Sequence, residues 1–210
     1  MRRWRWFLAP PPRLNPCEGE PISRDVTSVQ TKAVAGLVWC VALAVCFIVG
    51  RAVPVLALVD LGFHELGHLV TYFLPWELIT AVMGSVMQIA VPLGLAAYFA
   101  VKQHERVSAA VCLAWAGTSA WGVHVYVADA PFERLQLIGG DHDWAFILHE
   151  MDRMHAAAGL ARAVWLFGFA CVAAAIVACG WEPFRVARVE RKAERQAQVA
   201  KVAASLKWGM

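Results

Sequence analysis

The segment His64-Glu65-Leu66-Gly67-His68 combines residue types and spacing that can do chemistry. On an α-helix, side chains four residues apart lie on the same face, so His64 and His68 can direct their imidazoles at one metal ion. Glu65 follows the first histidine directly, where its carboxylate can take a proton from a metal-bound water. Zinc suits such a site because it accepts nitrogen and carboxylate ligands and keeps a position for water. The segment therefore predicts a zinc-dependent hydrolytic site with Glu65 as the general base.

A catalytic zinc site needs a third protein ligand, which must come from elsewhere in the chain. The best candidates are His142 and Asp143, which follow Gly139 and Gly140 where a polar loop meets an apolar stretch. Each has an alternative role, since Asp143 is well placed to cap the helix expected after it and His142 can be an exposed loop residue. We expect at least one of the two to bind the metal, and His149 is the reserve candidate.

Two further polar residues are expected close to the motif without being ligands. Asp60 stands four residues before His64 and shares its helical face, so one interpretation is that its carboxylate accepts a hydrogen bond from the outer nitrogen of His64. The pattern favours equally a polar residue near the mouth of the helix. Gln88 lies in an apolar run and must hydrogen-bond something, either bracing a neighbouring helix or contacting a substrate backbone.

The composition indicates that these residues are carried by membrane helices. Hydrophobic residues make up 60% of the 210 residues and charged residues 17%, against about 45–50% and about 25% in soluble domains. Runs of about 20 apolar residues are long enough to cross a bilayer. The apolar runs are at residues 33–50, 55–74, 79–101, 107–127 and 158–180, and an amphipathic stretch covers residues 144–156. We expect an all-α membrane protein, a polytopic helical bundle of about five to six membrane segments, with the motif in an early span.

Three regions follow from this pattern. Residues 1–32 form a basic N-terminal tail, residues 33–180 the membrane-embedded bundle, and residues 181–210 a basic amphipathic C-terminal tail. Basic flanks are retained on the cytoplasmic side, so the protein is expected in the cell membrane with both tails cytoplasmic. Five full crossings would separate the tails. Either the first two runs are not two complete crossings or residues 144–156 enter the membrane as well.

The C-terminal tail does not favour a nucleic-acid partner. Its basic residues are interleaved with Glu190 and Glu194, and the tail joins an apolar run at Trp181. A helix lying at the lipid headgroups accounts better for this pattern. The expected partners are the lipid bilayer and a membrane-protein or peptide substrate, while the oligomeric state is left open.

The motif in an early span, the span containing Gly84 and Pro92, and the acidic candidate Asp143 resemble the site-2 protease class of membrane-embedded zinc metallopeptidases, particularly its small bacterial-type members. The resemblance covers about residues 55–148, and residues 64–68 are its specific part. It implies that the two motif histidines bind zinc, that Glu65 is the general base, and that a later segment supplies an aspartate ligand. In that family the aspartate precedes a glycine, whereas Trp144 follows here.

The leading functional hypothesis is a zinc-dependent intramembrane or membrane-associated metallopeptidase. One alternative is a non-proteolytic zinc hydrolase that acts on a lipid or small amide, because the motif itself does not distinguish the two substrates. Another is a non-catalytic membrane scaffold with a vestigial metal site. The intact Glu65 argues against the scaffold, since a structural metal site needs no base.

Overall fold

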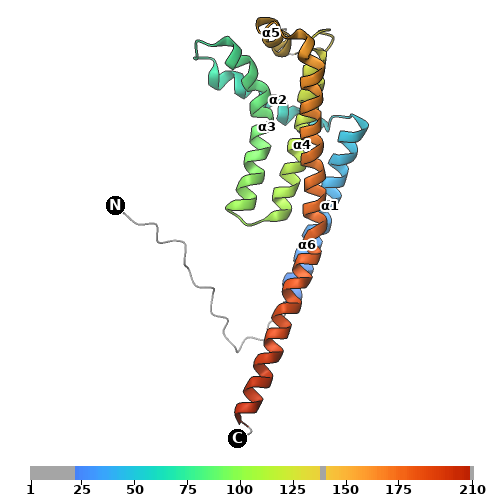
Figure 1. The fold of residues 1–210 in the computed structure, drawn as a ribbon, viewed down its shortest axis with the longest axis vertical. Coiled ribbons are helices and arrows are strands. Elements are labelled where there is room, and N and C mark those ends of the chain that lie inside the picture. Colours follow the sequence, from blue (N-terminus) through green and yellow to red (C-terminus); the bar gives the residue numbers. More distant parts are fainter. Residues whose placement is uncertain (1–21, 138–140, 209–210) are drawn as a thin grey trace, which may run out of the picture.

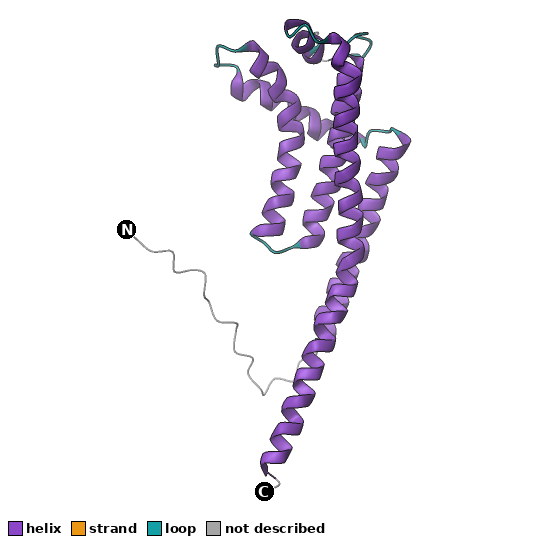
Figure 2. Ribbon diagram, viewed as in Figure 1, coloured by secondary structure: helices purple, strands orange, loops and turns teal. Residues whose placement is uncertain are grey.

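The chain folds into helices, in agreement with the all-α prediction. The computed structural model describes residues 22–137 and 141–208, and these contain no β-strand (Figure 1 and Figure 2). The α-helices are α1 (Ile22–Val49), α2 (Pro54–Thr71), α3 (Glu77–Val101), α4 (Arg106–Asp129), α5 (Asp143–Glu150) and α6 (Ala157–Trp208). A short 3-10 turn, η1 (Met154–Ala156), leads into α6.

Four helices are long and apolar enough to cross a membrane. The candidate spans are Gln30–Val49, Glu77–Val101, Arg106–Asp129 and Met154–Ala203. In the view of Figure 1, α1 and α4 run upward while α3 and α6 run downward, so successive candidate spans alternate in direction. Many of their apolar side chains are exposed, as contact with lipid requires. Examples are Val38, Trp39, Tyr98, Leu166 and Phe169. The four helices indicate a membrane-associated protein.

Helix α2, which carries the motif, is not one of these four candidate spans. The sequence-based expectation of about five to six segments counted it as a crossing. Asp60, His64, Glu65 and His68 reduce its apolar content. Figure 1 shows it running obliquely between α1 and α3, and it bonds to Gln88 and Ser119 near the middle of α3 and α4. The described residues thus contain four candidate spans, with the motif on an oblique helix.

Small residues let α4 and α6 pack closely at the centre of the bundle. A side chain on Gly117 would come within 2.8 Å of the backbone oxygen of Gly168, and a side chain on Gly168 would come equally close to the oxygen of Gly117. Ala114 and Ala175 are fully buried nearby. Small residues at such contacts are typical of helices that associate in lipid.

The approach of α2 to α3 depends on two glycines. A Cβ on Gly67 would overlap the backbone carbonyl of Met83 and lie 2.9 Å from the Cα of Gly84. The absence of a side chain at Gly67 therefore lets α3 come close to α2. Thr80, Gly84 and Gln88 are spaced four residues apart, so one face of α3 presents all three to the motif.

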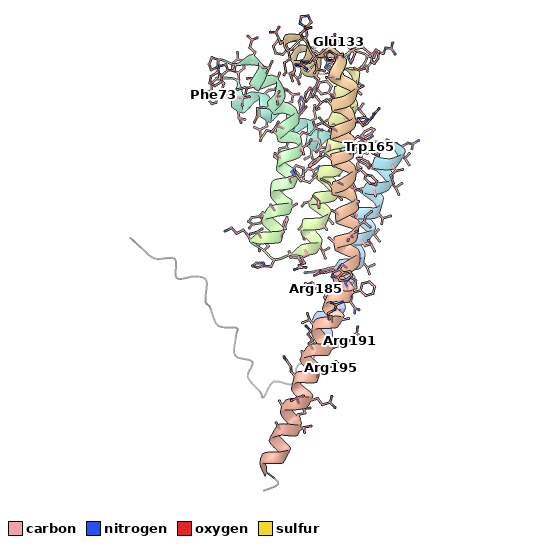
Figure 3. All side chains as sticks on the ribbon, viewed as in Figure 1. Phe73, Glu133, Trp165, Arg185, Arg191 and Arg195 are labelled. Atoms are coloured by element: carbon pink, nitrogen blue, oxygen red, sulfur yellow. The ribbon has the colours of Figure 1, made fainter. Side chains whose placement is uncertain are left out.

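The predicted tail boundaries do not coincide with breaks in the helices. Helix α1 begins at Ile22 rather than near residue 33, and α6 continues through residue 180 to Trp208. Figure 3 shows Arg185, Arg191 and Arg195 on the part of α6 that projects from the bundle. Pro183 lies inside α6 without ending it. The C-terminal basic segment therefore continues the last span instead of forming a separate helix.

Candidate metal centre

Three ligand side chains from two distant parts of the chain meet at one point. Asp143 Oδ2 lies 3.0 Å from His64 Nε2 and 3.2 Å from His68 Nε2. The ligand atoms of the three residues all lie within 4.8 Å of one another. Of the two residues proposed from the sequence as third ligand, the fold brings Asp143 to the histidine pair.

The outer nitrogen of each histidine faces an oxygen, which determines where its hydrogen lies. His68 Nδ1 is 2.8 Å from the backbone carbonyl of Thr80, which can only accept, so Nδ1 donates. His64 Nδ1 is 3.3 Å from Gln88 Oε1, while Gln88 Nε2 donates to the carbonyl of Ser119 at 3.3 Å. Because that carbonyl requires the amide nitrogen, the amide oxygen faces His64. Each neutral imidazole then presents its Nε2 lone pair to the site.

The site consequently gathers three acceptors around one point. Two imidazole lone pairs and a carboxylate oxygen repel one another unless a cation lies between them. A His₂-carboxylate set is one that zinc uses in catalytic sites. Gly84 forms the floor of the site, because a Cβ at this position would lie 2.6 Å from the Nε2 atoms of both His64 and His68. His64, His68 and Asp143 could therefore hold a metal ion.

Tyr126 of α4 holds Asp143 in place. The backbone N–H of Asp143 donates to the tyrosine hydroxyl at 2.9 Å, and the hydroxyl donates to Asp143 Oδ2 at 3.3 Å. The tyrosine is also partly buried, with its ring centroid 5.8 Å from that of His64. Sequence reasoning missed Tyr126, because a tyrosine in an apolar helix carries no signal of this role.

His142, and not Asp143, caps the N-terminus of α5. Its Nδ1 accepts from the backbone N–H of Ala145 at 3.2 Å, so it caps α5. Its Nε2 lies 3.5 Å from Asp129 Oδ2, and its ring stacks on Tyr126 with centroids 4.3 Å apart. His142 is therefore not part of the three-residue group. The reserve candidate His149 is exposed in α5 and lines a different hollow.

The prediction that Asp60 bonds the outer nitrogen of His64 is wrong. Asp60 Oδ1 instead accepts from Trp115 Nε1 and from Ser119 Oγ, both at 2.9 Å and both on α4. Gln88 takes the expected place on His64 because α3 packs against α2 through Gly67 and Gly84. The amide of Gln88 also donates to the backbone carbonyl of Ser119 on α4. Gln88 therefore braces a neighbouring helix, which is one of the two roles predicted for it.

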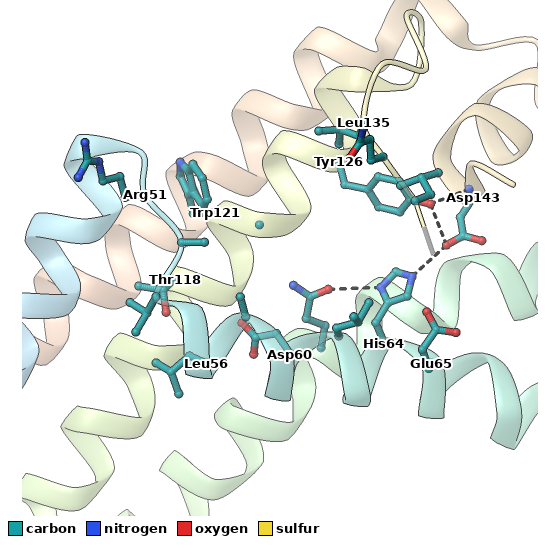
Figure 4. A pocket seen from close by; sticks show the side chains of 18 of the residues that line it. Arg51, Leu56, Asp60, His64, Glu65, Thr118, Trp121, Tyr126, Leu135 and Asp143 are labelled. Atoms are coloured by element: carbon teal, nitrogen blue, oxygen red, sulfur yellow. Dashed lines mark hydrogen bonds and ion pairs between the residues drawn. The ribbon is translucent and has the colours of Figure 1, made fainter. Parts of the chain in front are cut away.

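A cavity of about 410 Å³ opens beside the histidines and Asp143. Glu65 is exposed and lines it, and Figure 4 shows its carboxylate beside His64 on the side facing Asp143. Apolar side chains from α1, α2 and α4 form much of the remaining wall. They include Phe47, Leu56, Leu61 and Trp121. The motif's base therefore shares one hollow with the three candidate ligands.

Comparison of the chain with protein-family models, with curated proteins and with solved structures finds no match. Its function is therefore inferred from its own side chains.

Proposed function

We propose that this protein is a zinc-dependent membrane metallopeptidase, similar to the site-2 proteases, in which His64, His68 and Asp143 hold the ion and Glu65 is the general base. The observation that carries the proposal is the convergence of two Nε2 lone pairs and a carboxylate oxygen beside Glu65 in one cavity. Three protein ligands and an open hollow are the arrangement of catalytic zinc sites, whereas structural sites are closed by four ligands. This difference disfavours the scaffold alternative.

Each residue has a defined task in the proposed hydrolysis. Zinc bound there would supply a Lewis acid and lower the pKa of a bound water toward about 7. Thr80 and Gln88 keep both histidines in the tautomer with a free Nε2, and Tyr126 orients Asp143. Glu65 takes one proton from the attacking water and gives it to the leaving nitrogen. The water oxygen joins the carbonyl carbon, the C–N bond breaks, and the second water proton passes to the amine, so that a carboxylate and a protonated amine result.

The proposed membrane arrangement follows from the four candidate spans. If α1, α3, α4 and α6 each cross the bilayer, an even number of crossings returns the chain to its starting side. Both basic tails then lie on the same side, which the positive-inside rule makes cytoplasmic. Helix α2 carries the site between α1 and α3, beside Gln88 and Ser119 near the middle of α3 and α4. Leaving α2 out of the crossings removes the conflict that five crossings created.

The direct test is metal content and hydrolysis by the full chain in detergent. We expect the purified protein to hold about one zinc per chain by mass spectrometry, and His64→Ala together with His68→Ala to abolish it. Incubation with a pool of synthetic peptides and, separately, with acyl amides would distinguish a peptidase from a lipid or small-amide hydrolase. Zinc bound at full stoichiometry in the double variant would refute the site.

A further inference from the structure

Asp60 is a buried carboxylate that the proposed hydrolysis does not use. It is only 7% exposed, yet it lines the same cavity as His64 and Glu65. Oδ1 accepts from both Trp115 and Ser119. Among residues 22–137 and 141–208, no donor bonds to Oδ2. The second oxygen is thus available to a ligand in the cavity that Asp60 lines.

Burial raises the pKa of the Asp60 carboxyl, and no cation among the described residues offsets this. No lysine, arginine or histidine nitrogen of the described residues forms an ion pair with it, although Arg51 lines the same cavity. A carboxylate removed from water is costly unless a cation pairs with it. A charged nitrogen donor would also make a stronger hydrogen bond than a neutral one. The open oxygen therefore favours a cationic nitrogen from a ligand.

The cavity size limits what that ligand can be. The cavity measures about 410 Å³ and is lined largely by residues of α1, α2 and α4. A volume of this size accommodates a small ligand or a short peptide end.

The spacing along α2 relates the amine to the bond that is cut. Asp60 and His64 lie four residues apart on one face of α2 and line the same cavity. An amine held by Asp60 would therefore lie close to a bond at the metal site.

We propose that Asp60 is the subsite for the free α-amino group of a short peptide or exposed chain end, so that hydrolysis occurs near the amino terminus of the substrate. The inference rests on the proposed function, since the metal site supplies the reaction. Ser119 and Trp115 fix one oxygen of Asp60 and leave the other directed at the ligand. The substrate class is thus apolar peptides with an unblocked amino terminus.

The test uses leucyl-leucine hydroxamate, whose hydroxamate binds the metal, in two forms: one with a free amino terminus and one N-acetylated. Calorimetry on the zinc-loaded protein in detergent should show the free-amine form binding at least about tenfold more tightly. Asp60→Asn keeps an acceptor for Ser119 and Trp115 but loses the negative charge, and should bind both forms equally at unchanged zinc content. Asp152→Asn, the same change at an exposed position outside the cavity, should keep the preference.

Equal binding of both forms by the unaltered protein would overturn the inference without any variant. A preference retained in Asp60→Asn would overturn it as well. In either case, hydrolysis that depends on Glu65 would leave the proposed function intact. Zinc-loaded protein that binds neither hydroxamate would instead refute the proposed function, and the Asp60 subsite with it.

Discussion

His64 Nε2 and Asp143 Oδ2 lie 3.0 Å apart although the residues are separated by 79 positions in the chain. His64 is fixed from α3 by Gln88, and Asp143 is fixed from α4 by Tyr126. Neither residue is positioned by its own helix alone. The site therefore depends on the packing of α2, α3 and α4, and substitutions on any of the three should be visible in metal affinity.

Replacing Glu65 by glutamine should separate metal binding from catalysis. The amide is nearly isosteric but cannot take the proton, so hydrolysis of the peptide pool should fall by about 10²–10⁴-fold while zinc content is unchanged. Glu150→Gln, at an exposed position at the end of α5, is the matched control and should keep full activity. Full activity in Glu65→Gln would remove Glu65 from the mechanism.

The neighbouring residues His142 and Asp143 should respond oppositely to alanine. Asp143→Ala removes a ligand and should lose zinc while circular dichroism shows the helices intact. His142→Ala removes the cap of α5 and should lower stability by about 0.5–2 kcal/mol with zinc still bound. Thermal unfolding and metal analysis of the two variants measure both effects. Zinc loss in His142→Ala with zinc retained in Asp143→Ala would reverse the assignment.

The sequence was sufficient to predict the local features. The apolar run predicted at residues 79–101 corresponds to α3 (Glu77–Val101) in the structure. A proline before the run and charged residues after it limit the helix at its two ends. The i, i+4 spacing alone placed His64 and His68 on one face. These predictions need only the period of a helix and the identity of the residues that end it.

Features that depend on a second helix could not be predicted. The choice between His142 and Asp143 depends on Tyr126, which approaches from α4. Likewise, Asp60 shares a helix face with His64, but whether it turns to His64 or to α4 depends on where Ser119 lies. The oblique course of α2 is a similar case, since hydrophobic length does not give direction.

Gln88 offers a test of the tautomer argument. Gln88→Leu has similar volume but cannot accept from His64 Nδ1, so zinc affinity should fall by about 10–100-fold. Competition with a fluorescent zinc chelator measures this affinity. Gln103→Leu, in the exposed turn after α3, is the matched control and should leave the affinity unchanged. If Gln88→Leu only lowers the melting temperature, Gln88 serves as a brace between α3 and α4 and does not orient His64.

Gly84 and Gly94 form a matched pair on one helix for testing the floor of the site. A Cβ on Gly84 would lie 2.6 Å from the Nε2 atoms of both His64 and His68, closer than real contacts allow, whereas a Cβ on Gly94 meets nothing within 4 Å. Alanine favours a helix over glycine by about 1 kcal/mol, so Gly94→Ala should raise the melting temperature slightly and leave zinc bound. Gly84→Ala gains the same propensity but must displace both imidazoles, so it should lose zinc affinity sharply. Chelator competition and thermal unfolding on the two variants provide the comparison. Equal zinc affinity in Gly84→Ala and Gly94→Ala would mean that the two Nε2 atoms do not converge above Gly84, and the metal site as described would be wrong.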